Sequence, residues 1–346
     1  SLENSINLQS SIIQTNGSTG RGGTIQISGL NSTFLDSSII NAQGLLYGGN
    51  IYVGNNLTSG LIPFTASLFI NSSSALNANQ ISVNDPLSKG GFIETSGRFI
   101  VEPFAQINSG MGGEWLIDPN GISIGTNMAG QISTALRTQN VTISSLNGTN
   151  TCTPFACRGD DVVPAGWIWV NDSIANPGSG QYTLTLRASH GILINEGEGP
   201  ITIWTRGHQI YDAPALTLNE DFTAKTTIAG KRIQFNSTIT GAQSLTVTTY
   251  LLENGDGSVI FNETIGGDAP SGIDNARIYA LSIKTGTLAA GKILTDTSQS
   301  VYIGVSESST ITGNIDTGTF TKAGVGSLTL SGNNTYTGLT NIDVGT

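Results

Sequence analysis

The chain has 346 residues, of which 14 are Lys or Arg and 24 are Asp or Glu, so its formal net charge is −10. An acidic chain without clusters of Lys and Arg is a poor nucleic-acid binder, because neutralising phosphates requires grouped cations. No apolar run approaches the roughly 18 residues that a membrane-spanning helix needs. The sequence therefore predicts neither a nucleic-acid partner nor a membrane span.

The first 117 residues repeat one pattern. Residues 10–29 read SSIIQTNGSTGRGGTIQISG and residues 37–55 read SSIINAQGLLYGGNIYVGN. Aligning the central isoleucines gives a column with steps of 27, 36 and 31 residues: Ile13, Ile40, Leu76 and Ile107. Gly-Gly pairs recur in a second column: Gly22, Gly48, Gly90 and Gly112.

Repeats of this length with two or three short alternating strands are typical of the coils of a solenoid. One side chain in two points inward, Gly occupies the corners, and Asn forms ladders between corners. The predicted fold class is therefore all-β, a right-handed parallel β-helix. A β-sandwich array is less favoured, because Asn-Gly and Asp-Gly hairpin signals are few.

The repeating strand pattern is interrupted between residues 118 and 180, where we expect an irregular insertion. QISTALRT (131–138) places Ile132, Ala135 and Leu136 at helical spacing, which predicts a short helix. Cys152 and Cys157 follow in TCTPFACRGDD, either as a small disulfide loop, which would favour an exported protein, or as two free thiols. The lack of neighbouring histidines argues against a metal site there.

Strands recur every 10 to 15 residues from Gln181 onward, so the solenoid is expected to continue with looser coils. The predicted organisation is β-helix coils over 1–117, an irregular segment over 118–180, and further coils over 181–346.

Several segments resemble the filamentous-haemagglutinin class of two-partner-secreted bacterial exoproteins. These are GGFIETSGRFIVEP (90–103), GEWLIDPNGISIG (113–125) and WVNDSI (169–174) with the strands that follow it. The tail KAGVGSLTLSGNNTYTG (322–338) is similar to a strand repeat of autotransporter passengers. The family's N-terminal secretion domain is not recognisable, which suggests an internal segment.

The resemblance implies export through an outer-membrane secretion partner and a secreted or cell-surface location. It also implies attachment to host cells, other cells or glycan surfaces. We therefore expect a structural rod segment of a filamentous adhesin. The alternatives are a self-assembling filament subunit joined end to end, and a polysaccharide-active β-helix enzyme.

The sequence argues against the enzyme. Glycan hydrolysis needs paired carboxylates on one face, whereas Asp160–Asp161 and Glu196/Glu198 are loop neighbours. His190 and His208 lie in no catalytic or metal-binding spacing, and each is expected to cap a turn. No catalytic residue, metal or cofactor is predicted.

Two features suggest binding. Arg158-Gly159-Asp160 can form an integrin-binding loop, although these three residues also occur together by chance. Trp167 and Trp169 can stack on sugars, whereas the simpler interpretation is that they and Trp115 plug the coils or seal the insertion against its helix.

Ten Asn-x-Ser/Thr triplets are candidate N-glycosylation sites. Chance supplies most of them in so Asn- and Ser-rich a chain. They begin at Asn16, Asn31, Asn56, Asn71, Asn140, Asn147, Asn171, Asn236, Asn262 and Asn333.

Overall fold

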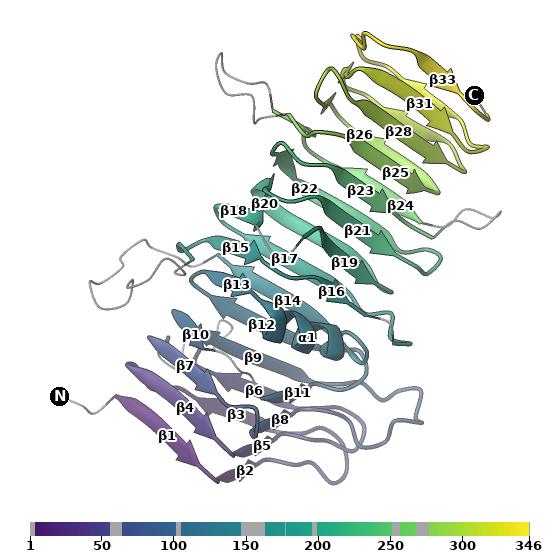
Figure 1. Ribbon diagram of the computed structural model, residues 1–346. Helices are drawn as coiled ribbons and strands as arrows, with labels where there is room; N and C mark the ends of the chain where they lie inside the picture. The colour runs from purple at the N-terminus through teal and green to yellow at the C-terminus, as the bar shows by residue number, and fades with distance from the viewer. Residues whose placement is uncertain are drawn as a thin grey trace. The chain divides into compact units, whose positions relative to one another are not determined.

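The computed structural model describes residues 4–55, 64–101, 105–146, 163–176, 178–195, 199–250, 257–267 and 277–345. Its strand pairs are parallel and in register, which confirms the predicted β-solenoid. Contacts divide the chain into unit 1 (Ser1–Ile168 and Gly178–Leu184) and unit 2 (Trp169–Pro177 and Thr185–Thr346). Within each unit, strands of successive coils lie side by side (Figure 1).

Each full coil of unit 1 contributes one strand to each of three sheets. The first sheet contains β1 (Ser5–Gln9), β4 (Ser32–Asp36), β7 (Ser67–Ile70) and β10 (Phe99–Val101). The second contains β2 (Ile12–Gln14), β5 (Ile39–Asn41), β8 (Ala75–Asn77) and β11 (Gln106–Asn108). The third contains β3 (Thr24–Ile27), β6 (Asn50–Val53), β9 (Phe92–Gly97), β12 (Gly113–Pro119) and β14 (Gln139–Ser145).

Both columns predicted from the repeat are confirmed. Ile13 pairs with Ile40, Ile40 with Leu76, and Leu76 with Ile107, across coils of unequal length. The glycine column lies where coil backbones approach closely. A Cβ on Gly48 would lie 1.7 Å from the Ala78 carbonyl oxygen and 2.3 Å from the Gly91 nitrogen, so only glycine fits.

Inward-facing apolar side chains form the core of unit 1. They alternate with outward polar residues along each strand, as pleating requires. The central column of the third sheet is Ile25, Ile51, Ile93, Trp115 and Val141. At the corners, Asn77 Nδ2 donates to Asn41 Oδ1 at 2.9 Å, a rung of the expected Asn ladder.

The segment 118–180 contains the predicted helix together with five strands or parts of strands, the first of which is the end of β12. The helix α1 (Thr126–Ala135) begins and ends earlier than predicted, and its N-cap residue Gly125 provides no side-chain hydrogen bond. It buries Met128, Ala129 and Ile132. The other elements are β13 (Ile122–Ile124), β14, β15 (Trp167–Val170) and β16 (Ile174–Ala175).

Unit 2 has two long sheets and a short third face. One sheet contains β17 (Leu184–Ala188), β20 (Gln209–Leu218), β22 (Arg232–Thr240), β24 (Ser258–Phe261), β26 (Thr287–Ala290), β29 (Ser309–Ile311) and β32 (Leu328–Leu330). The other contains β16, β19 (Ile201–Thr205), β21 (Phe222–Thr226), β23 (Leu245–Thr248), β25 (Leu281–Thr285), β28 (Ser300–Val305), β31 (Thr319–Ala323) and β33 (Thr340–Ile342). The third face uses β18 (Gly191–Ile194), the ends of β20 and β22, β27 (Ile293–Leu294) and β30 (Ile315–Asp316).

The third face of unit 2 shows how the core is maintained without a continuous strand. Its inward positions form one apolar column, partly through isolated bridges, and every member is fully buried. The column is Leu216, Ile239, Ile265, Ile293 and Ile315.

Candidate functional site

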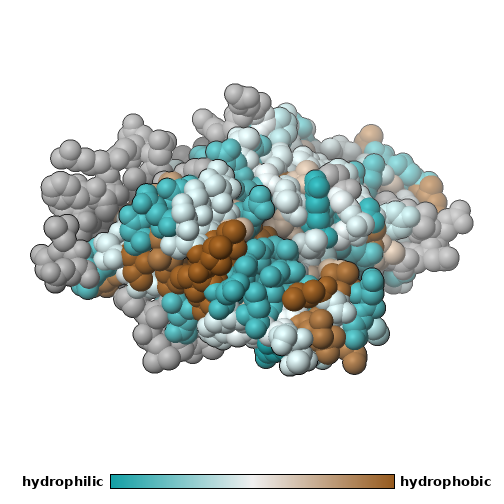
Figure 2. Space-filling model, turned by 90° about the horizontal axis from the view of Figure 1, so that it is seen from below, coloured by the Kyte–Doolittle hydropathy of each residue, from teal (hydrophilic) through white to brown (hydrophobic). Residues whose placement is uncertain are grey.

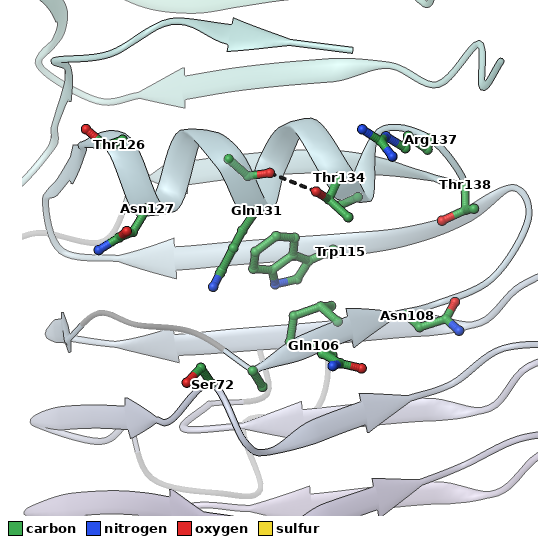
Figure 3. Close-up of a pocket in the computed structure, with 14 residues that line it drawn as sticks. Ser72, Gln106, Asn108, Trp115, Thr126, Asn127, Gln131, Thr134, Arg137 and Thr138 are labelled. Carbon is green, nitrogen blue, oxygen red and sulfur yellow. Dashed lines mark hydrogen bonds between the residues drawn. The ribbon is translucent and has the colours of Figure 1, made fainter. Parts of the chain in front are cut away.

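A groove of about 880 Å³ lies in unit 1 between α1 and the neighbouring coil (Figure 3). We call it the α1 groove. The coil side contributes Ser72 and the segment 105–108, and the base is Trp115. The helix side contributes Thr126, Asn127, Gly130, Gln131, Thr134 and Ala135, followed by Arg137 and Thr138.

The groove exists because a helix occupies the place of a strand. β11 is the last strand of the second sheet, and α1 lies beyond it. A helix satisfies its own backbone internally and cannot pair with a strand edge. Gln139 compensates in part: its Oε1 accepts from Ser109 N–H at 2.6 Å, and its Nε2 donates to Ile107 O at 3.4 Å. One amide side chain thus caps the end of the sheet.

The base of the groove is apolar and held in place. Trp115 is fully buried, and its indole Nε1–H donates to Thr95 Oγ1 at 2.9 Å. Ala105 and Ala135 are also buried beside it. A buried indole whose N–H is satisfied forms a rigid wall.

The rim is polar. Figure 3 shows Asn127 and Gln131 extending from α1 towards the coil that carries Gln106 and Asn108. Asn108 Oδ1 accepts from Gly110 N–H at 3.1 Å, which orients its amide. Thr134 Oγ1 donates back to Gly130 O at 3.0 Å. The groove therefore combines oriented amides and hydroxyls with an apolar base.

The tryptophans predicted to stack on sugars lie on β15. Trp167 and Trp169 are half-buried on its outer side, and the alternating residues Ile168 and Val170 point into the core. Their glycan-stacking role stays a prediction. Trp115, by contrast, occupies the core position beside the helix that the sequence suggested.

Two predicted features fall outside the described residues. These are the cysteine pair Cys152 and Cys157 and the loop Arg158-Gly159-Asp160.

The candidate glycosylation sites divide by exposure. Asn16, Asn31, Asn262 and Asn333 are exposed, and Asn56 and Asn147 lie outside the described residues. The other four are half-buried: Asn71, Asn140, Asn171 and Asn236. Several of the half-buried side chains bond other groups; Asn140 Oδ1, for example, accepts from Thr183 N–H at 2.9 Å.

His208 links two coils. Its Nδ1 accepts the Arg232 backbone N–H at 2.9 Å, which requires the neutral imidazole. Burial, and then the charges of Lys231 and Arg232, lower the pKa of His208 below its ordinary value.

Within the described part of the chain, no group of three or more His, Cys, Asp or Glu is placed to hold a metal ion. None of its helices is long and apolar enough to cross a membrane.

Comparison with protein families found a similarity at the C-terminal end of the chain. Residues 320–346 match the passenger-associated transport repeat. The match indicates a passenger-type segment, exported through an outer-membrane transporter and secreted or exposed at the cell surface. No curated protein and no solved structure matched the chain.

The passenger-associated transport repeat continues the solenoid. Val301 pairs with Phe320, and Phe320 pairs with Thr340, so the repeat takes its register from the preceding coil. Phe320 stacks on Tyr336 with ring centroids 5.7 Å apart.

The same repeat contains a buried cation that the sequence did not reveal. Lys322 continues the inward column below Ile303 and is only 3% exposed. Its Nζ donates to the carbonyl oxygens of Gly324 at 2.5 Å, Val344 at 2.7 Å, and Gly326. Strand alternation in FTKA was the available signal, since it places Phe320 and Lys322 on the same face.

The sequence did not predict the α1 groove. Its residues come from four separate segments, and no local motif connects them. The only available signal was the helix that interrupts the strand text.

Proposed function

We propose that this chain is a structural solenoid segment of a secreted or surface-displayed bacterial adhesin. The observation that carries the proposal is the passenger-associated transport repeat, which is in register with the coils before it. A passenger displayed outside the cell and built from stacked coils extends its surface away from the cell. The two-partner route of the filamentous-haemagglutinin class is the export route that we favour.

The surface supports a role in contact. Unit 1 exposes large apolar side chains, among them Ile12, Ile81, Val83, Leu87 and Met111, which are 50% to 69% exposed. Figure 2 shows apolar side chains gathered into a patch on one face. Such patches on soluble proteins commonly mark interaction surfaces.

We propose that the segment binds and does not catalyse. The described residues that line the α1 groove include no carboxylate. Hydrolysis of a glycosidic bond normally uses two carboxyl groups, one as acid and one as base or nucleophile.

The test uses the producing cell. Antibodies raised against the purified chain should label intact cells or the culture medium, and deletion of the gene should reduce attachment to surfaces and to other cells. Reintroducing the gene should restore attachment. Labelling that requires permeabilised cells, or attachment unchanged by the deletion, would contradict the proposal.

A further inference from the structure

We propose that the α1 groove binds an acidic saccharide, with its hydroxyls held by amide side chains and its anionic group held by Arg137. This inference rests on the proposed function, because it names the ligand class through which the adhesin would attach. The volume of the α1 groove, about 880 Å³, lies within the range of small-ligand pockets, roughly 300–1,000 Å³.

The polar groups of the groove match a polyhydroxylated ligand. Four amide side chains line it, and each offers donors and an acceptor side by side: Gln106, Asn108, Asn127 and Gln131. Four hydroxyls add further donors and acceptors: Ser72, Thr126, Thr134 and Thr138. Neighbouring hydroxyls of a sugar ring can each donate and accept, which suits this alternation.

The base of the groove matches the other property of a sugar ring. The C–H groups of a pyranose form an apolar face that packs on aromatic and aliphatic surface. Ile107 is partly exposed between the two polar rims and offers such a surface, and the buried Trp115, Ala105 and Ala135 complete the apolar base. The hydrogen bond from Trp115 to Thr95 holds the buried part of this base in place.

Charge selects among saccharides. Arg137 is the single charged residue among the described residues of the lining, and it is exposed just beyond the end of α1. A guanidinium pairs with a carboxylate or sulfate through two parallel hydrogen bonds. Because the described lining contains no carboxylate that could compete for Arg137, an anionic substituent is favoured although the whole chain is acidic.

An extended peptide is the competing ligand, since it could add a strand to the edge of β11. Gln139 already bonds Ser109 N–H and Ile107 O along that edge. A peptide would therefore have to displace this amide, whereas a saccharide would bind the side chains of the rim and leave Gln139 in place. The contacts favour the saccharide.

The test screens the purified full-length chain against immobilised oligosaccharides that are neutral, carboxylate-bearing or sulfated, and against a library of extended peptides. We expect selective retention of an acidic saccharide. Titration calorimetry then compares the retained compound and its neutral analogue on wild type, Gln131→Ala, Arg137→Ala and the control Arg98→Ala, whose side chain is exposed elsewhere in unit 1. Circular dichroism checks that all variants fold.

Gln131→Ala should weaken binding of both compounds. Arg137→Ala should weaken the acidic saccharide by about tenfold or more and change the neutral analogue little, and Arg98→Ala should leave both unchanged. The preference between carboxylate and sulfate compounds identifies the anion. Retention of no saccharide, retention of peptides alone, or equal binding by Arg137→Ala would overturn the proposal.

Cell attachment separates this inference from the proposed function. If gene deletion abolishes attachment and the Arg137→Ala strain attaches normally, the proposal of saccharide binding in the α1 groove is wrong, and the proposed adhesin function is supported. If deletion leaves attachment intact while the purified chain binds acidic saccharide through Arg137, the proposed adhesin function is wrong, and saccharide binding in the α1 groove is supported.

Discussion

The ring of Tyr211 stacks on that of Phe235 in the next coil, with centroids 4.7 Å apart and planes inclined by 8°. Phe235 stacks in turn on Phe261 at 4.9 Å. The Tyr211 hydroxyl donates to Gln209 Oε1 at 2.7 Å, so the polar end of the column is also satisfied. Each ring therefore packs on its counterpart in the neighbouring coil, and the column joins three coils inside unit 2.

Phe235→Ala should lower the free energy of unfolding of unit 2 by about 3–5 kcal/mol, because it removes the central ring and leaves a cavity. The measurement is denaturant unfolding followed by circular dichroism. Leu339→Ala is the control: Leu339 is 73% exposed, so its loss should cost less than about 0.5 kcal/mol. Equal effects of the two substitutions would contradict a stabilising column.

Gly48→Ala should destabilise unit 1 by about 3 kcal/mol or more, since the new Cβ would overlap backbone atoms of the next coil that cannot move independently. Thermal unfolding checks this. Gly20→Ala is the matched control, because no atom lies within 4 Å of its added Cβ. A Gly48→Ala protein as stable as Gly20→Ala would show that the coils separate more easily than their spacing indicates.

Lys322→Met should lower the free energy of local opening of the passenger-associated transport repeat by about 1–3 kcal/mol. The reason is that the carbonyls of Gly324, Gly326 and Val344 lose their hydrogen-bond donor. Burial lowers the pKa of Lys322, while these carbonyls stabilise its charged form. Hydrogen exchange of the amides of residues 319–345 is the measurement.

The control for this prediction is Lys284→Met. Lys284 is an exposed residue whose Nζ lies 5.6 Å from the Tyr302 ring centroid, so its loss should cost at most about 1 kcal/mol. Unchanged exchange in Lys322→Met would mean that the ammonium contributes nothing to the repeat.

Unit 2 should lose stability as the pH falls below about 6.5, the ordinary pKa of histidine. The pKa of His208 is lowered in the folded state, so the unfolded chain takes up its proton first, below about pH 6.5. The contribution of His208 to the free energy of unfolding is therefore complete above that pH. It is lost as the pH falls through the lowered pKa of the folded state.

The pH prediction is tested by unfolding His208→Asn across the same range. The Asn Oδ1 can still accept the Arg232 N–H without titrating, so the slope of stability against pH should flatten. His190→Asn, which replaces an exposed imidazole, is the control and should behave as wild type. An unchanged slope in His208→Asn would assign the pH dependence to another group.

Sequence reasoning was most successful where one coil repeats the chemistry of another. The column from Ile13 to Ile107 followed from pattern alone, because a shift by one residue would turn its apolar side chains outward. The start of α1 was missed because Gly125 gives no side-chain cap, and sequence locates helix starts mainly by such caps.

The sequence by itself determined the solenoid, its strand register and its glycine column, because these depend on alternation and on backbone spacing between neighbouring coils. Only the tertiary structure decided where side chains from distant segments meet. In the structure the Gln139 side chain accepts from Ser109 N–H in place of a pairing strand, and Lys322 donates to three carbonyl oxygens. The α1 groove forms between α1 and the neighbouring coil, with Trp115 at its base. The Gln139 contact and the groove depend on which element lies next to β11, where a helix leaves a strand edge without a pairing strand, and the Lys322 contacts depend on how the chain after β31 returns to the same strand.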